Sequence, residues 1–88
     1  MSCKYCVYVL ESQKDKSIYI GYTNDLKRRL DGHNKGFYPS TKSRIPFRVA
    51  AYEAYSSEID AGARERRLKQ FKNAYKELLK RINNCIEK

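Results

Sequence analysis

Two early segments of the chain alternate aromatic or β-branched residues with smaller or polar ones. They run over residues 5–11 and 17–23, and the polar residues 13–16 separate them. Alternation of this kind on both sides of a short polar turn is typical of a β-hairpin. The chain is therefore expected to open with two antiparallel strands.

After the hairpin the hydrophobic period becomes helical. Residues 26–34 have helical spacing, Asn24 is a good N-cap, and Gly36 is suited to end the helix. Residues 37–46 then combine Pro and Ser with two basic side chains, which predicts a basic loop. A loop of this kind could close over a ligand.

The second half of the chain predicts one more strand and two more helices. Residues 47–55 alternate again, and Ser56 or Ser57 could cap a helix that runs to about Phe71. One apolar face of a third helix follows, with residues at i, i+3, i+4, i+7 and i+11. These residues are Tyr75, Leu78, Leu79, Ile82 and Ile86. The order ββαβαα predicts an α+β fold, a small three-stranded antiparallel sheet with helices packed on it, in which residues 1–88 form a single domain.

Basic residues outnumber acidic ones in this chain. Nineteen Lys and Arg stand against ten Asp and Glu, which gives a formal net charge of +9. A field of this sign attracts polyanions such as nucleic acid or anionic membranes, and charge alone does not choose between them. The apolar run over residues 5–10 is shorter than a signal-peptide core, and no stretch is long enough to span a membrane. We therefore expect a cytoplasmic protein that does not enter a membrane.

The three cysteines, Cys3, Cys6 and Cys85, do not form a recognisable framework. An odd number of cysteines without a secretion signal argues against structural disulfides. Cys3 and Cys6 have C-x-x-C spacing, but a zinc site normally needs two more ligands at matching spacing. We expect ordinary thiols.

Two polar residues interrupt the apolar stripe of the first predicted helix. A helical wheel places Leu26 and Leu30 together, with His33 inside their stripe and Arg29 on its margin. His33 could be a core histidine bonded to the backbone, and Arg29 could pack its stem while its head reaches water. In the functional interpretation, the histidine moves a proton and the arginine stabilises charge on phosphoryl oxygens.

A glycine interrupts the second predicted strand. Alternation puts Cys6, Tyr8 and Leu10 on one face of the first strand, and Tyr19 and Gly21 on one face of the second. Glycine within a strand costs stability unless something approaches the backbone closely. Because the two strands should pair, the hydroxyls of Tyr8 and Tyr19 could converge, although strand tyrosines are commonly core aromatics.

The second predicted helix carries one acidic residue, Glu65, among the cations Arg64, Arg66, Arg67 and Lys69. On a solvated helix, Glu65 would pair with Lys69 at i+4. In the functional interpretation, Glu65 is an oxygen ligand for a hard divalent cation. Tyrosine hydroxyls, arginine, histidine and a carboxylate-held metal together suit phosphodiester hydrolysis.

Two short motifs in the predicted hairpin are similar to the signature of a nuclease family. They are Cys6-Val7-Tyr8 in the first strand and Tyr19-Ile20-Gly21 in the second. With these motifs the chain resembles the GIY-YIG nuclease family, in particular its small free-standing members, which look like the N-terminal nuclease domain of the UvrC repair protein. The resemblance covers nearly the whole chain and implies the α+β fold given above.

Later segments of the chain resemble the same family. Residues 23–30 are similar to its first helix, which implies that Arg29 is the catalytic arginine, with Arg28 as the alternative register. His33 matches the family's histidine, and Glu65 matches its metal-binding glutamate. The resemblance implies five residues around one Mg2+ or Mn2+, with one of the tyrosines as the base for the attacking water. These five are Tyr8, Tyr19, Arg29, His33 and Glu65.

The function implied by the resemblance is that of a metal-dependent endonuclease. It would hydrolyse phosphodiester bonds in nucleic acid, DNA in the first instance, in repair or recombination, leaving a 5′-phosphate and a 3′-hydroxyl. Gly21 is the expected structural residue of the motif, and the expected nucleic-acid contacts are Lys27, Arg28, Lys42 and Arg44. Because 88 residues leave no room for a separate recognition domain, specificity should come from DNA shape or from a partner protein. The alternative is a catalytically silent nucleic-acid-binding module that acts with a partner protein.

Overall fold

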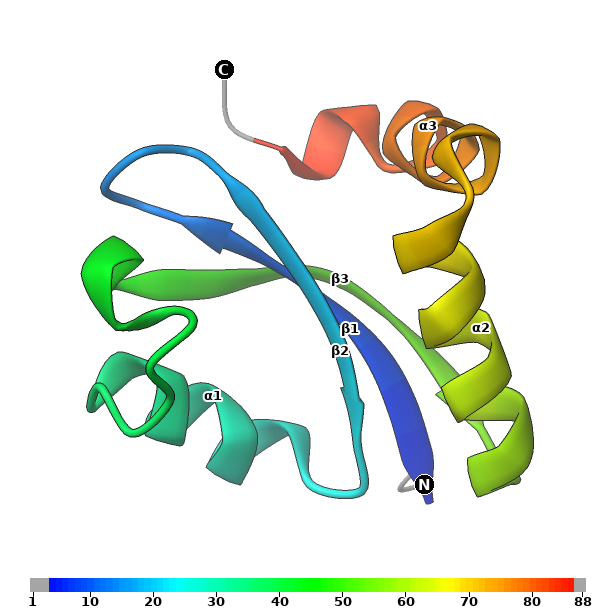
Figure 1. The fold of residues 1–88 in the computed structure, drawn as a ribbon, viewed down its shortest axis with the longest axis horizontal. Helices are drawn as coiled ribbons and strands as arrows, with labels where there is room; N and C mark the ends of the chain where they lie inside the picture. The colour runs from blue at the N-terminus through cyan, green and yellow to red at the C-terminus, as the bar shows by residue number, and fades with distance from the viewer. Residues whose placement is uncertain (1–3, 87–88) are drawn as a thin grey trace.

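The computed structural model describes residues 4–86 and shows a three-stranded antiparallel sheet with helices on both faces (Figure 1). The strands are β1 (Tyr5–Ser12), β2 (Ile18–Thr23) and β3 (Phe47–Tyr55), and the helices are α1 (Leu26–Asn34), α2 (Glu58–Gln70) and α3 (Lys72–Arg81). Two short 3-10 turns, η1 (Lys42–Arg44) and η2 (Asn83–Cys85), complete the element order. The predicted order ββαβαα and the α+β class are confirmed. Cys3, one half of the C-x-x-C pair, lies outside the described residues.

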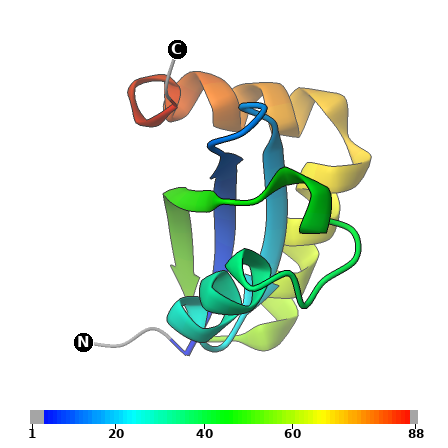
Figure 2. The same cartoon turned by 90° about the vertical axis from the view of Figure 1, so that its left-hand side faces the viewer.

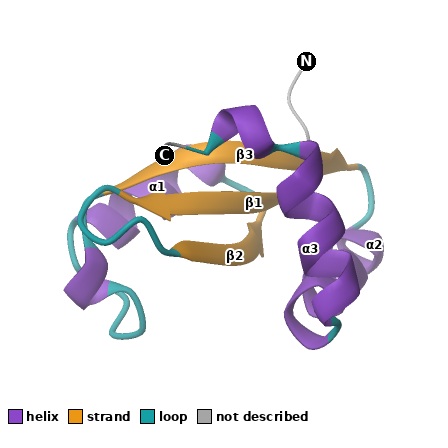
Figure 3. Cartoon of the chain, turned by 90° about the horizontal axis from the view of Figure 1, so that it is seen from above, coloured by secondary structure: helices purple, strands orange, loops and turns teal. Residues whose placement is uncertain are grey.

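Strand β1 lies at the centre of the sheet, between β2 and β3, as Figure 3 shows. Both neighbours run antiparallel to β1, and Tyr8 lies opposite Gly21 on β2 and Tyr52 on β3. Successive side chains of a strand point to opposite faces, and both faces of this sheet are covered. For this reason nearly all of β1 is buried.

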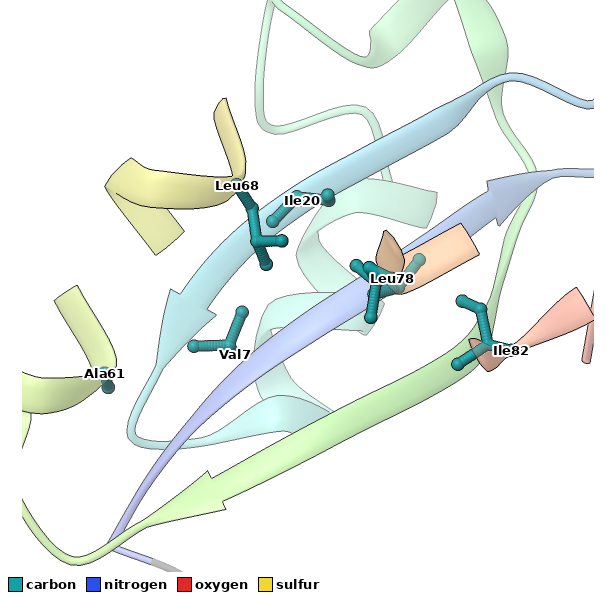
Figure 4. Packing of buried hydrophobic residues seen from close by; sticks show 7 residues of the cluster. Val7, Ile20, Ala61, Leu68, Leu78 and Ile82 are labelled. Atoms are coloured by element: carbon teal, nitrogen blue, oxygen red, sulfur yellow. The ribbon is translucent and has the colours of Figure 1, made fainter. Parts of the chain in front are cut away.

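The apolar side chains divide between two packed faces of the sheet. On the face covered by α2 and α3, Val7 and Val9 of β1 lie in a core with helix residues. Figure 4 shows Val7 among the side chains of that core. The buried members of that core are Val7, Val9, Ile20, Ala61, Leu68, Leu78 and Ile82. On the opposite face, Tyr8, Leu10 and Phe47 pack beneath α1. The predicted alternation of β1 is confirmed, and burial of these side chains is the main term that favours folding.

The ends of α1 lie close to the predicted positions. Asp25 is the N-cap, because its carboxylate accepts the N–H of Arg28 at 3.1 Å. The prediction that Asn24 is the cap is wrong by one residue, since the N–H at the third helical position is the one that a cap side chain reaches. After the helix, Gly36 has a φ of 78°, a left-handed conformation that glycine adopts at little cost, so Gly36 does end the helix.

The two C-terminal helices are shorter than predicted. Helix α2 is capped by Ser57 and ends one residue before the expected position. Helix α3 ends at Arg81, so the predicted continuation of the helix to Ile86 is wrong. Instead, the C=O of Cys85 in η2 accepts a hydrogen bond from the Arg48 guanidinium of β3 at 2.6 Å. This contact brings the chain back toward the sheet, and Ile86 still packs against the core.

The loop over residues 37–46 returns from α1 to β3 on the α1 side of the sheet (Figure 2). At the end of α1, the Asn34 side chain accepts the N–H of Phe47 at 2.6 Å and donates to its C=O at 3.0 Å. The loop also contains the turn η1, which a plain basic loop does not predict. These contacts hold the loop over the face of the sheet that carries Tyr8.

Candidate functional site

His33 lies between two hydroxyl groups at the centre of a polar cluster beneath α1. Its side chain is buried, its Nε2 atom is 3.3 Å from the Tyr8 hydroxyl, and its Nδ1 atom is 2.8 Å from Thr41 Oγ1. Tyr8 and Thr41 are also buried. Both ring nitrogens therefore lie at hydrogen-bond distance from side-chain hydroxyls. The alternative of a core histidine bonded to the backbone is not what the structure shows.

The contacts of Thr41 bear on the tautomer of His33. Thr41 Oγ1 also lies 3.4 Å from the C=O of Tyr38, a group that can only accept. When the Thr41 hydroxyl donates to Tyr38, it accepts the Nδ1–H of His33, and the ring proton is then on Nδ1. Nε2 is then the nitrogen with the lone pair, and the Tyr8 hydroxyl donates to it. The result is a directed chain of hydrogen bonds whose last donor is the Tyr8 phenol.

Burial shifts the pKa values of Tyr8 and His33 in the directions that favour their uncharged forms. Burial is the larger of two causes that raise the pKa of Tyr8 well above its ordinary value, and the neighbouring Tyr19 is the second. The Arg29 guanidinium offsets part of this rise. Burial also lowers the pKa of His33, and the positive charges of Arg29 and Arg44 lower it further. A neutral phenol and a neutral imidazole are the states that the hydrogen bond between them requires.

Tyr38 covers His33 and Arg29 from the loop. Its ring centroid is 4.5 Å from that of His33, and the Arg29 Cζ atom is 5.3 Å from the same centroid. The Tyr38 ring packs so closely on α1 that a Cβ atom at Gly32 would lie 3.0 Å from it. The sequence predicts no role for Tyr38, and it singles out Thr41 only within the run Ser40-Thr41-Lys42, which is similar to the loop of the small free-standing family members. The available signal is Gly32, since glycine inside a helix costs about 1 kcal/mol relative to alanine.

Tyr19 reaches the cluster from β2. Its ring centroid is 6.4 Å from that of Tyr8 and 5.2 Å from that of His33, so the two tyrosines do converge. Arg44 of η1 lies over the Tyr19 ring at 6.0 Å and donates to Ser17 Oγ. Because Tyr19 is half-buried and Tyr8 is buried, Tyr19 is the tyrosine that solvent reaches.

Gly21 leaves room for the Tyr8 ring. A Cβ atom at Gly21 would lie 2.5 Å from Tyr8 Oη and 2.7 Å from Tyr8 Cζ, closer than van der Waals radii allow. The close approach expected at this glycine is therefore that of Tyr8, whose ring crosses β2 on its way to His33.

Glu65 is linked to the cluster through Lys69. The two side chains form an ion pair on α2 at 2.7 Å, and the Lys69 Nζ atom lies 5.2 Å from the Tyr19 ring centroid. The i+4 pair expected of a solvated helix is thus present. The Glu65 side chain is nevertheless only 15% exposed, which is low for a carboxylate on a solvated helix face.

Comparison with known proteins places this geometry in a family. The model of the GIY-YIG catalytic domain matches residues 4–83. The chain belongs to the GIY-YIG family. Its two signature motifs lie side by side on β1 and β2, and Tyr8 and Tyr19 both belong to the cluster beneath α1. A GIY-YIG catalytic domain implies an activity of the nuclease type.

Several relatives of this GIY-YIG chain are UPF0213 proteins. One from Streptococcus pneumoniae serotype 4 is 40% identical and aligns over 88% of this chain and 78% of its own length. One from Halobacterium salinarum is also 40% identical, over 83% of this chain and 95% of its own length. The solution NMR structure of a UPF0213 protein from Bacillus halodurans has 37% identity and a TM-score of 0.55, and covers 89% of this chain and 83% of that one. The fold is therefore shared with a solved UPF0213 protein.

GIY-YIG nucleases typically use a divalent metal ion. Within residues 4–86, no three His, Cys, Asp or Glu side chains gather as a metal-binding group. A closed zinc site does not suit this donor set, whereas Mg2+ is commonly held by one or two carboxylates with water and substrate phosphates. The partly covered carboxylate of Glu65 fits a site of that second kind.

The four cations expected to contact nucleic acid differ in exposure. Lys27 and Arg28 are exposed on α1, with Arg28 4.0 Å from Asp25, and Lys42 is exposed on the loop. Arg44 is half-buried, and its guanidinium donates two hydrogen bonds inside the protein. Lys27, Arg28 and Lys42 are therefore the more accessible of the four. None of the helices within residues 4–86 is long and apolar enough to cross a membrane.

Proposed function

We propose that this chain, acting as one domain, is a metal-dependent endonuclease that hydrolyses phosphodiester bonds in nucleic acid, with DNA as the expected substrate. The observation that carries the proposal is the convergence of Tyr8, Tyr19, Arg29 and His33 in one partly accessible cluster. A plain apolar core needs none of these polar groups, and perturbed titratable groups gather at functional sites. The expected role in repair or recombination rests on the family resemblance alone.

Tyr19 is the residue that we assign to the attacking water. It is partly exposed, and a hydroxyl at the edge of the cluster can orient a water molecule toward phosphorus. Tyr8 is less suited to this role, because burial raises its pKa and so disfavours loss of its proton. Tyr8 could act as a base only by passing its proton to His33 Nε2, which lies 3.3 Å away.

His33 is assigned to proton movement behind Tyr8. Its Nε2 atom faces the Tyr8 hydroxyl, and its lowered pKa disfavours the protonated ring. Thr41 and Tyr38 keep the ring in this orientation from the opposite side. His33 can therefore relay a proton but does not store one.

Arg29 and Glu65 are assigned to the charge of the phosphate. The Arg29 guanidinium rests against the Tyr38 ring, where it can stabilise charge that builds on the phosphoryl oxygens. Glu65 would hold the divalent ion, which, when bound, neutralises charge on the leaving side and lowers the pKa of water.

The test is cleavage of labelled nucleic acid by the purified full chain. Single-stranded, duplex and branched DNA, and RNA of the same sequence, are incubated with Mg2+, with Mn2+ or with EDTA. Glu65→Gln removes the carboxylate charge and keeps the shape, while Glu77→Gln makes the same change at an exposed position of α3. We expect metal-dependent cutting that falls by about 100-fold in Glu65→Gln and by less than about twofold in Glu77→Gln.

The same assay tests the second candidate function, a catalytically silent nucleic-acid-binding module. The observation that favours this module is the Glu65–Lys69 ion pair, because Lys69 occupies the carboxylate that a metal ion would need. If no substrate is cut under any condition while DNA is still bound, the silent module is the better description. Cutting that persists in EDTA or in Glu65→Gln would contradict the metal role of Glu65.

A further inference from the structure

A groove lies outside the tyrosine–histidine cluster, along the edge of the sheet formed by β2. It has a volume of about 340 Å³ and separates β2 from the junction of α2 and α3. Ile18, Ile20 and Leu68 contribute apolar lining, and Figure 4 shows Ile20 of β2 and Leu68 of α2 facing each other. Tyr75 of α3 adds an aromatic ring. The groove is therefore suited to a flat, largely apolar group.

Cations and an amide border this groove. Lys69 at the end of α2, Lys72 at the start of α3, and Gln70 between them line it and are exposed. Among the described residues that line the groove there is no Asp or Glu. Next to them, Phe71 is 54% exposed, and the Arg67 guanidinium lies 5.5 Å from the centroid of its ring. Basic and aromatic groups therefore alternate across this corner of the molecule.

Tyr19 connects the groove to the candidate active site. Its ring lies 5.2 Å from that of His33 in the cluster, and the same residue lines the groove. The Lys69 Nζ atom also lies 5.2 Å from the Tyr19 ring centroid. A ligand with a phosphate at Tyr19 would therefore extend its neighbouring group into the groove.

We propose that the groove binds one unpaired nucleobase of the strand whose phosphate lies at Tyr19. This inference rests on the proposed function and narrows its substrate to nucleic acid with a base out of the stack. Such a base is flat and can stack on the Tyr75 ring, while the flanking phosphates meet Lys69 and Lys72. The Gln70 amide can both donate to and accept from a base edge. An apolar peptide would offer no counter-charge to Lys72, whereas Lys69 already has one in Glu65.

The test measures binding in EDTA, where metal-dependent cleavage cannot compete. The probe is a DNA oligonucleotide that carries the fluorescent base 2-aminopurine at successive positions, used as a single strand and as a fully paired duplex. Lys72→Glu reverses a charge at the groove. Lys80→Glu makes the same change in net charge at an exposed position of α3 that does not line the groove. Tyr75→Leu removes the aromatic ring and keeps an apolar side chain.

We expect quenching of 2-aminopurine at a particular position of the bound single strand, because the base stacks on tyrosine, and loss of this quenching in Tyr75→Leu. Lys72→Glu should weaken single-strand binding about tenfold and Lys80→Glu less than about threefold. Thermal unfolding checks that Tyr75→Leu is folded. If it is not folded, the difference in single-strand binding between Lys72→Glu and Lys80→Glu tests the inference.

Equal weakening by Lys72→Glu and Lys80→Glu would overturn the inference, because it would show that only net charge matters. Absence of position-dependent quenching, or preference for the fully paired duplex, would also overturn it. The outcome is separable from that of the cleavage assay. A protein that cuts nothing but binds a base in the groove would retain this inference and lose the proposed hydrolysis.

Discussion

At the residue scale, the hydroxyl of Thr41 bears on which nitrogen of His33 carries the proton. Thr41 is fully buried, and its Oγ1 atom lies within hydrogen-bond distance of two groups, the Tyr38 C=O and His33 Nδ1. The Tyr8 phenol can donate to His33 only while Nε2 keeps its lone pair. Thr41 is therefore a positioning residue that acts on Tyr8 through the imidazole ring.

Thr41→Val keeps the shape of the side chain and removes the acceptor. The buried Nδ1–H of His33 would lose its partner, which should lower the free energy of unfolding by about 1–3 kcal/mol. Thr41→Ser restores the hydroxyl and should recover most of this loss. Urea unfolding measures the stability, and 15N NMR of the histidine ring reports the tautomer. An unchanged ring spectrum in Thr41→Val would show that Thr41 does not set the proton position.

Residues in regular elements could be predicted for the site, and residues in the loop could not. Tyr8, Tyr19 and His33 lie where strand or helix periodicity fixes the face to which a side chain points. Thr41 and Tyr38 lie in the loop over residues 37–46, which has no period. Their positions depend on long-range contacts, so no local sequence pattern predicts their contacts with His33.

At the scale of elements, the pairing of β1 with β2 brings Gly21 against Tyr8. The two residues are direct partners in the register, and the Tyr8 ring lies across the glycine. A side chain at this position would push the ring away from the hydrogen bond with His33. The glycine of the second signature motif is thus required by a contact between strands, with no need for an unusual backbone conformation.

Gly21→Ala should destabilise the protein and displace Tyr8. The added methyl group would lie 2.5 Å from Tyr8 Oη in a packed interior, and overpacking of this kind costs about 1–3 kcal/mol. Gly62→Ala is the matched control, because its Cβ atom would be 3.4 Å from the flexible end of Arg66 and alanine favours a helix by about 1 kcal/mol. The free energy of unfolding, measured with urea, should fall in Gly21→Ala and rise in Gly62→Ala. If Gly21→Ala left the free energy of unfolding unchanged, the strands would be able to shift and accept the methyl group.

Element boundaries were less predictable than element types. The alternation of β1 and the helical period of α1 are strong local signals, and both elements lie where they were predicted. The end of α3 has no such signal, because Ile82 and Ile86 continue the helical period. The helix stops at Arg81, and the contact of Cys85 with Arg48 on a strand distant in sequence could not be read from that period.

At the scale of the whole molecule, buried titratable groups link stability to pH. The pKa of His33 is lowered from 6.5, and hydrogen bonding from Arg64 lowers the pKa of Glu53 from 4.5. The pKa of Tyr8 is raised from 10.0. The chain has one histidine, so proton uptake by a side chain between pH 4.5 and 6.5 is expected to occur at His33.

We expect the free energy of unfolding to fall on both sides of a neutral plateau. Below pH 6.5 the unfolded chain takes up a proton at its histidine more readily than the folded chain does, because the pKa of folded His33 is lowered, so acid favours unfolding. Above pH 10.0 the unfolded chain loses the Tyr8 proton while the folded chain keeps it, so alkali also favours unfolding. Urea unfolding across this range measures both limbs, and His33→Gln should remove the part of the acid limb between pH 6.5 and 4.5 while leaving the alkaline limb. If the free energy of unfolding of His33→Gln fell in acid as much as that of the unchanged protein, another group would be taking up the proton. That result would contradict a neutral, buried imidazole at His33.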